Sequence, residues 1–442
     1  MEIILVSIFV LGYLAITLEH TLKIDKLIPA LAMMAILWAI IALNHMPVFE
    51  VDTSLKQLVP THIDEILLHH LGKTAEIIIF LLGAMTIVEI IDYFNGFSTI
   101  KSFIKTKSKK ALLWIFAILA FILSAIIDNL TATIVLITIL QKVIGDRDTR
   151  LWFAGLIIIS ANAGGAWSPI GDVTTTMLWI ANKVTTLKLI SYLFIPSVVC
   201  VVVPVFVASL LPAFKGDIET NDKEDEEVIH KYGSTMLYLG LAAIVFVPVF
   251  KTITHLPPYV GMMFSLAVVS TFAEIFSATK INITSIDEDS DAASHHSPVH
   301  KSLSKIELPS ILFFLGILLA VAALESLGML FGFAETLNTA IPNTDIVIML
   351  LGIGSAVIDN VPLVAASIGM FSEPMDNPLW HFIAFSAGTG GSMLIIGSAA
   401  GVVAMGMEKI DFFWYFKNIS WLAFLGFISG SVTFMLLRGF IV

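Results

Sequence analysis

Two acid–amide pairs, Asp128-Asn129 and Asp359-Asn360, stand inside otherwise apolar stretches and are the first candidates for chemistry. Almost the same letters surround them, SAIIDN in the first case and SAVIDN in the second. An ionisable side chain with apolar flanks is costly to bury and is therefore expected to serve a function. We expect each pair to form the tip of a re-entrant helical hairpin. The alternative is an ordinary turn between two complete helices.

Two glycine-rich segments, SANAGGAWSPIGDVTTT at 160–176 and SAGTGGSMLIIGSAAG at 386–401, interrupt long apolar runs. Glycine and proline weaken a helix interior, so each segment predicts a helix that is broken partway. A break exposes backbone carbonyl oxygens, which suit a cation, as do helix C-termini. The alternative is that the small residues let neighbouring helices approach closely. The glycines to which we assign a structural role are Gly164, Gly165, Gly390 and Gly391.

The two tips and the two glycine-rich segments together offer many oxygen atoms but no Lys or Arg. A negatively charged, oxygen-only site suits a small hard cation and disfavours an anion. A carboxylate that binds a cation also binds a proton, so competition between the two at one site is a sufficient mechanism for exchange. The predicted ligands are Asp128, Asp172, Asp359, Asn129, Asn162, Asn360, Ser160, Ser386, Thr174, Thr175 and Thr389.

The composition places these residues in a membrane protein. The chain has 442 residues, of which 57% are hydrophobic and only 13% are charged. Soluble domains have about a quarter charged residues, so an ordinary soluble enzyme is excluded. The net charge of −11 excludes a nucleic-acid binder, and the single cysteine excludes an internal disulfide or a thiolate metal cluster. Long unbroken apolar runs predict an all-α polytopic membrane protein.

The chain also repeats itself in order. FLLG at 80–83 matches FFLG at 313–316, and the acid–amide motifs and the glycine-rich segments then match in turn. Such internal matches predict two homologous halves. We place the first half at 1–214, an acidic linker at 215–233 and the second half at 234–442, with hairpins at 111–144 and 346–370, broken helices at 151–181 and 379–407, and a polar loop at 278–306.

The basic residues predict how the halves are oriented. Loops 101–110 and 141–150, on either side of the first hairpin, are rich in Lys and Arg, which favour the cytoplasmic side. The segments that flank the second hairpin contain neither residue, so this hairpin should enter and leave on the opposite side. Inverted repeats of this kind are common in secondary transporters. We expect a multi-pass protein of the cell inner (plasma) membrane, with the acidic segments 215–233 and 278–306 in the cytoplasm.

Four segments carry a resemblance to a known family. SAIIDNLTATIVL, SANAGGAWSPIGDVTTTMLWI, SAVIDNVPLVAA and GTGGSMLIIGSAAGVVAMG resemble the signature segments of NhaD-type sodium/proton antiporters. These belong to the ion transporter superfamily, with arsenite pumps and dicarboxylate and citrate carriers as relatives. The resemblance implies two inverted repeats, each with about five transmembrane helices and one re-entrant hairpin, and helices interrupted near the membrane midplane. It also implies a homodimer whose mobile transport domains move against a scaffold.

The hairpin tips distinguish cations from anions within that superfamily. Dicarboxylate carriers have Ser-Asn-Thr there, whereas this chain has Asp128-Asn129-Leu130-Thr131 and Asp359-Asn360-Val361-Pro362. The extra carboxylates favour a cation, and Thr131 joins the predicted ligand set. Asp172 corresponds to Ser398 in the second half, so the site should be asymmetric. The resemblance implies Na⁺ at Asp128, Asn129, Asp172 and Asn360.

The leading hypothesis is therefore a secondary transporter that exchanges Na⁺, and Li⁺, for H⁺, with small cations, protons and the lipid bilayer as its partners and no cofactor. One alternative is a Na⁺-coupled carrier of arsenite or of di- or tricarboxylates. A more distant one is a membrane-embedded enzyme that uses paired aspartates.

Overall fold

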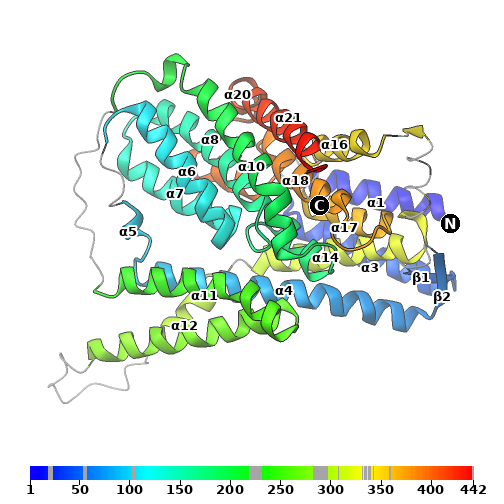
Figure 1. The fold of residues 1–442 in the computed structure, drawn as a ribbon. Helices are drawn as coiled ribbons and strands as arrows, with labels where there is room; N and C mark the ends of the chain where they lie inside the picture. The colour runs from blue at the N-terminus through cyan, green and yellow to red at the C-terminus, as the bar shows by residue number, and fades with distance from the viewer. Residues whose placement is uncertain are drawn as a thin grey trace. The chain divides into compact units, whose positions relative to one another are not determined.

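The computed structural model describes residues 1–17, 23–52, 57–101, 106–218, 231–281, 297–306, 308–330, 332, 336, 340–341, 343–357 and 360–440. Almost all of their regular structure is helical (Figure 1). Within the described residues, the one sheet is a hairpin in which β1 (Val48–Asp52) runs antiparallel to β2 (Gln57–Thr61). The predicted all-α fold is confirmed, and this short hairpin is an addition that no sequence signal indicated.

The fold comprises two compact units, and each contains segments from both predicted halves. Unit 1 consists of residues 1–75, 107–219 and 309–442, and unit 2 consists of residues 76–106 and 220–308. The helix α4 (Ile63–Tyr93) begins in unit 1 and ends in unit 2. The compact units therefore do not coincide with the two halves of the sequence.

In unit 1 the same order of elements occurs twice: a hairpin, a helix, a short second helix and a long apolar helix. In the first half these are α6 (Lys109–Ile127), α7 (Asn129–Val143), α8 (Arg147–Ala166), α9 (Val173–Ile180) and α10 (Thr186–Ala208), followed by the 3-10 turn η1 (Pro212–Phe214). In the second half they are α16 (Thr344–Gly354), α17 (Asn360–Met370), α18 (Pro378–Gly390), η2 (Gly391–Met393), α19 (Ala399–Glu408), α20 (Phe412–Asn418) and α21 (Ser420–Leu437). In each half the short second helix, α9 or α19, begins after an interruption of the preceding helix.

The remaining helices of unit 1 are α1 (Glu2–Thr17), α3 (Leu27–Leu43), α14 (Leu308–Ser326) and the start of α4. The indole Nε1 of Trp38 in α3 donates to the carbonyl oxygen of Leu319 in α14 over 2.9 Å. The Ser326 hydroxyl at the end of α14 lies 3.2 Å from Nε2 of His70 in α4. These polar contacts join the N-terminal helices of the chain to α14.

Unit 2 contains the end of α4 together with α5 (Ser98–Lys101), α11 (Gly233–Thr254), α12 (Pro258–Ile281) and α13 (Pro298–Leu303). Gly240 of α11 faces Ile91 of α4, and Gly83 of α4 faces Met262 of α12. Small residues of this kind let apolar helices approach closely. The end of α4 therefore packs against both α11 and α12.

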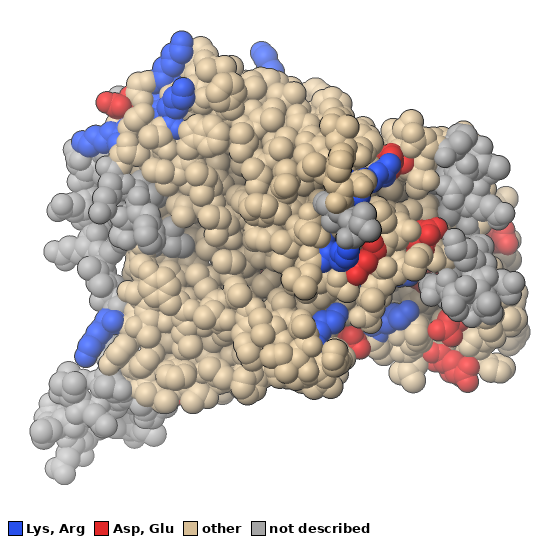
Figure 2. Space-filling view, in the orientation of Figure 1, with Lys and Arg blue, Asp and Glu red and all other residues tan. Residues whose placement is uncertain are grey.

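Within the described part of the chain, six helices are long and apolar enough to cross a bilayer: α4, α6, α10, α11, α12 and α21. Many of their large apolar side chains are exposed, for example Phe206 in α10 and Trp421 in α21. On the face shown in Figure 2, uncharged side chains cover broad areas and charged ones are few. An apolar exterior suits lipid as the solvent, so the protein is a membrane protein.

Candidate cation site

The first hairpin turns sharply at Asp128, between α6 and α7. Asp128 has φ 77°, a conformation that is uncommon for a residue with a side chain. Its Oδ1 accepts from the backbone N–H of Thr131 over 2.7 Å, and its Oδ2 accepts from the Thr131 hydroxyl over 2.9 Å. Asp128 thus caps the N-terminus of α7. Its carboxylate also lies close enough to interact electrostatically with Asp172.

Asn129 connects this tip to the first broken helix. Its side chain is buried, and Nδ2 donates to Asn162 Oδ1 over 3.0 Å and to Asp172 Oδ1 over 3.3 Å. The other oxygen of Asp172 accepts from the Thr174 hydroxyl over 2.5 Å. Asn162 comes from the end of α8, whereas Asp172 and Thr174 come from the start of α9. Hairpin and broken helix thereby meet at one buried carboxylate.

Asn162 also crosses to the second half of the chain. Its Nδ2 donates to the Ser392 hydroxyl over 2.9 Å and to the Ser398 hydroxyl over 3.0 Å. Ser398 caps α19 by accepting from the N–H of Gly401. It is the residue that matches Asp172 in the sequence repeat. The structure thus brings the two broken helices together at Asn162.

The second tip differs from the first. Asp359 and its neighbour at 358 lie outside the described residues. Asn360 is buried, and with its amide oriented to suit its neighbours the nitrogen donates to Ala387 O, Gly397 O and the Ser355 hydroxyl at 3.1, 3.0 and 3.2 Å. All three partners belong to the second half. Asn360 therefore links the second hairpin to both sides of the interruption between α18 and α19.

The four predicted glycines lie where backbones touch. A Cβ added to Gly164 would lie 2.3 Å from the carbonyl oxygen of Phe121 in α6, and one on Gly390 would lie 2.0 Å from that of Gly352 in α16. Gly165 and Gly391 face the carbonyl oxygens of Gly171 and Gly397 in the same way, at 2.4 and 2.6 Å. Each hairpin arm is therefore pressed directly against its broken helix, with no room for a side chain.

The predicted hydroxyl ligands do not all point at the carboxylates. Ser160 and Thr389 donate to carbonyl oxygens one turn back in their own helices, and Thr175 donates to Asp172 O over 2.9 Å. The Ser386 hydroxyl is buried without a hydrogen-bond partner among the described residues. In this arrangement Thr174 is the predicted hydroxyl that contacts the Asp172 carboxylate.

Four serines at the site were not on the predicted list. Ser392 and Ser398 contact Asn162, as described above. Ser124 and Ser355 donate from the two hairpins to Ala161 O and Ala387 O over 2.6 and 2.9 Å. Ser124 and Ser355 are the first letters of the repeated SAIIDN and SAVIDN motifs, so the repeat itself carried the signal that was needed to find them.

The cluster around Asp172 contains the kinds of oxygen atoms that hard cations bind. The atoms around Asp172 are carboxylate, amide and hydroxyl oxygens and amide nitrogens, all buried. Among the described residues, no three His, Cys, Asp or Glu side chains gather in a metal-binding group. Mixed oxygen ligands with one or two carboxylates suit a monovalent or weakly held hard cation better than a resident transition metal.

Known proteins resemble this chain along its length. The sequence matches the family described as citrate transporter over residues 3–380. Sodium/proton antiporters 1 and 2 of Arabidopsis thaliana are 41% and 39% identical, over 98% of this chain and 72% and 99% of their own lengths. The Na(+)/H(+) antiporter NhaD of Vibrio cholerae is 32% identical over 98% of this chain and 91% of its own. The crystal structure of the Alcanivorax borkumensis YdaH transporter matches with a TM-score of 0.53 at 12% identity, over 94% of this chain and 97% of that one.

The matching family and the relatives, which are named as antiporters, show that the chain is a transporter rather than an enzyme. The match to the YdaH structure agrees with this fold. The chain belongs to the citrate transporter family and, within it, to the group of the NhaD-type sodium/proton antiporters.

Proposed function

We propose that the protein exchanges Na⁺, and also Li⁺, for H⁺ by alternating access around the Asp172 cluster, which we place near the membrane midplane. The observation that carries the proposal is the buried carboxylate of Asp172, which lies within the field of Asp128 and is surrounded by amide and hydroxyl groups from both halves. Two carboxylates whose negative charges repel each other favour uptake of one positive charge, which can be a metal ion or a proton. The names of the full-length relatives support the same pair of ions.

The hydrogen bonds of Asn129 suggest how the two ions compete. In the arrangement seen here, Asn129 points amide hydrogens at Asp172 Oδ1 and Asn162 Oδ1, and these are oxygen atoms that a cation would need. An arriving Na⁺ would require the amide to turn and offer its oxygen instead. A proton on Asp172 would remove the negative charge that holds Na⁺. Binding of Na⁺ therefore releases the proton, and binding of a proton releases Na⁺, so competition at this one site is enough to couple the two ion movements.

A Na⁺-coupled anion carrier is the second candidate, because the family itself is described as citrate transporter. The carboxylates of Asp128 and Asp172 would repel a di- or tricarboxylate. The tips and the glycine-rich segments contain no Lys or Arg, and the arginines of α8 lie at its far end, at Arg147 and Arg150. We therefore place citrate below Na⁺ as the transported ion.

The opposite orientation of the two halves, an inner-membrane location and a homodimer belong to the same proposal. Cysteine accessibility from each side of the membrane tests the orientation, since Cys200 is buried and is the one cysteine of the chain. The mass of the detergent-solubilised protein, measured by light scattering, tests the dimer.

Everted vesicles with an established proton gradient test the transport function. We expect NaCl and LiCl to collapse the gradient, and KCl or citrate to leave it in place. Collapse by citrate with no effect of Na⁺ alone would favour the anion carrier. A gradient that none of the four compounds affects, with the protein present in the membrane, would overturn the proposal.

A further inference from the structure

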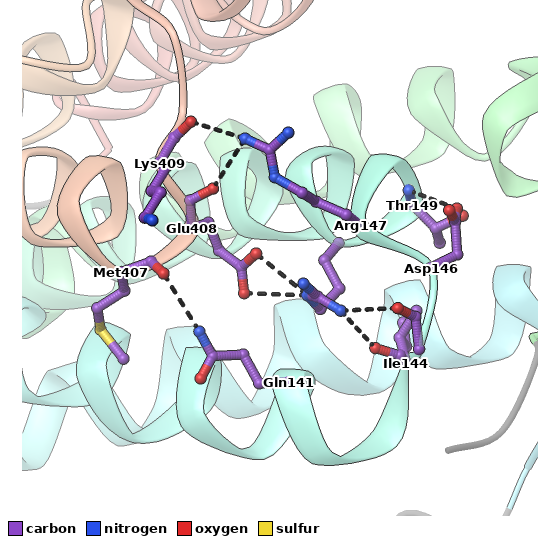
Figure 3. Close-up of polar contacts among 10 residues, drawn as sticks. Gln141, Ile144, Asp146, Arg147, Thr149, Met407, Glu408 and Lys409 are labelled. Carbon is purple, nitrogen blue, oxygen red and sulfur yellow. Dashed lines mark hydrogen bonds and ion pairs between the residues drawn. The ribbon is translucent and has the colours of Figure 1, made fainter.

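The helices α8 and α19 lie antiparallel and are joined at both ends. At the site, Asn162 near the end of α8 donates to Ser398 at the start of α19. At the far end, Arg150 in the first turn of α8 bonds Glu408, the last residue of α19 (Figure 3). These two residues are 258 positions apart in the sequence and belong to different halves. We call the contacts at the far end the α8–α19 tie.

The α8–α19 tie is a partly buried network of hydrogen bonds around the buried side chain of Glu408 (Figure 3). The Nε of Arg150 donates to both carboxylate oxygens of Glu408 over 3.2 and 3.1 Å, and the Glu408 side chain is only 1% exposed. Arg147 donates to the carbonyl oxygens of Glu408 and Lys409, and Gln141 donates to that of Met407. The last carbonyls of α19 are thus capped by cationic and amide side chains, as a helix C-terminus favours.

Arg150 also bonds the corner between α7 and α8. Its Nη1 donates to the carbonyl oxygens of Ile144 and Gly145 over 3.1 and 2.9 Å. One guanidinium group therefore holds the base of the first hairpin, the start of α8 and the end of α19. A guanidinium has five donors in a fixed planar arrangement, which a lysine cannot reproduce.

The second half makes a related contact with different chemistry. The corner between α17 and α18 contacts the loop between α9 and α10, where Asp376 accepts from the N–H and hydroxyl of Thr185, the N-cap of α10, over 2.7 and 2.9 Å. Asp376 N–H donates in turn to Lys183 O over 2.8 Å. At the site end of this pair, a Cβ on Gly388 of α18 would lie 3.2 Å from Asp172 Oδ2. Each half thus contacts the other in the region that follows a broken helix, at Glu408 in one case and at Lys183 and Thr185 in the other.

The position of these far contacts matters because α9 and α19 are short. They have 8 and 10 residues, and each begins directly after the non-helical segment that interrupts its broken helix. A helix rises 1.5 Å per residue, so α19 carries a displacement of Glu408 over about 15 Å to Ser398 as a rigid rod. Ser398 bonds Asn162, and Asn162 bonds Asn129, which contacts Asp172. A shift at the tie therefore reaches the carboxylate through three hydrogen bonds.

We propose that Arg150 and Glu408 are positioning residues for the cation site: the α8–α19 tie sets the axial position of α19 and thereby the ligand geometry around Asp172. This inference rests on the proposed cation exchange. Neither residue contacts the cation, so their loss should weaken Na⁺ binding more than it slows turnover. A displacement of about 1 Å at a reacting centre costs up to about a hundredfold.

The test compares Glu408→Gln with a matched ion pair elsewhere in unit 1. The control is Asp345→Asn, since Asp345 also pairs with an arginine in a two-bond contact, at 2.5 and 2.6 Å from Arg438. In everted vesicles we expect Glu408→Gln to raise the KM for Na⁺ at least about tenfold, with the maximal rate within twofold. Arg150→Lys keeps the positive charge but loses the planar arrangement of donors, and it should give a smaller increase in the KM for Na⁺. Asp345→Asn should leave the KM unchanged.

Three results bear on the inference. An unchanged KM in Glu408→Gln and Arg150→Lys, with wild-type exchange intact, overturns the positioning role and leaves the proposed function standing. Equal KM increases in Glu408→Gln and Asp345→Asn also overturn it, because any lost ion pair would then have the same effect. A wild type without Na⁺-driven proton movement overturns both. Should Glu408→Gln fail to reach the membrane, Gln141→Ala removes a single bond of the tie and must still raise the KM.

Discussion

Replacing Asp172 by asparagine separates the charge of the site from its hydrogen bonds. The new side chain keeps an oxygen to accept from Asn129 and gains an amide nitrogen facing Thr174, whose hydroxyl can turn to accept. The fold should therefore lose no more than about 1 kcal/mol, which is the usual cost of one altered hydrogen bond. What disappears is the negative charge of a residue that is only 4% exposed.

The magnitude follows from Coulomb's law. Two unit charges 4 Å apart interact by about 4 kcal/mol at an effective dielectric constant of about 20. Since about 1.4 kcal/mol changes an equilibrium tenfold, Asp172→Asn should weaken Na⁺ binding by about a thousandfold. At millimolar Na⁺ the variant should therefore collapse no proton gradient in everted vesicles, while its membrane content and Tm in detergent match the wild type.

The matched control is Asp64→Asn, which makes the same chemical change at an exposed position in the first turn of α4. It should retain full exchange. Exchange by Asp172→Asn at more than a tenth of the wild-type rate, at low Na⁺, would refute the central role of this carboxylate. Loss of exchange together with loss of folded protein would show instead that the hydrogen-bond reasoning is wrong.

Three further outcomes are expected. Asp128→Asn should still cap α7, and therefore fold, but it should lose exchange in the same vesicle assay; full activity would exclude Asp128 from the site. Gly164→Ala places a Cβ against the α6 backbone and should lower the Tm or abolish the folded protein, whereas Gly406→Ala, with open space around it, should match or exceed the wild type. Asp146→Ala should cost about 1 kcal/mol as an N-cap loss. Because hydrogen bonds from Thr149 lower the pKa of Asp146, this contribution is full above the unfolded pKa of about 3.9 and is lost as pH falls through the still lower folded pKa, so the melting curves of wild type and variant should only begin to converge below about pH 4.

Local signals in the sequence indicate where the backbone of the first half departs from a regular helix. The turn at Asp128 and the break after α8 lie in the two motifs that combine polar residues or glycines with apolar flanks. Glycine and proline interrupt a helix, and an aspartate caps the next one, through contacts with residues only a few positions away in the sequence. The comparison of the halves added a further signal, because Gly164 and Gly390 face equivalent carbonyl oxygens in the structure.

Contacts between segments that are distant in the sequence could not be predicted from such local signals. Glu408 ends an apolar helix and Arg150 begins another, and nothing in either segment indicates that they meet. The direction of the Asn129 hydrogen bonds also depends on the side chains that three separate elements bring together. The division into compact units depends on how α4, α11 and α12 pack, which hydrophobic patterning does not reveal in a chain that is apolar on most faces.

The Asn162–Ser398 contact has a consequence for biosynthesis. Asn162 is made 236 residues before Ser398. When the first half leaves the ribosome, the polar tip and the first broken helix therefore lack partners from the second half. Exposed polar backbone is not tolerated in lipid, so this half must wait beside the translocon, in water or against other proteins. The hydrogen-bonded cluster around Asn162 is therefore completed only after almost the whole chain has been synthesised.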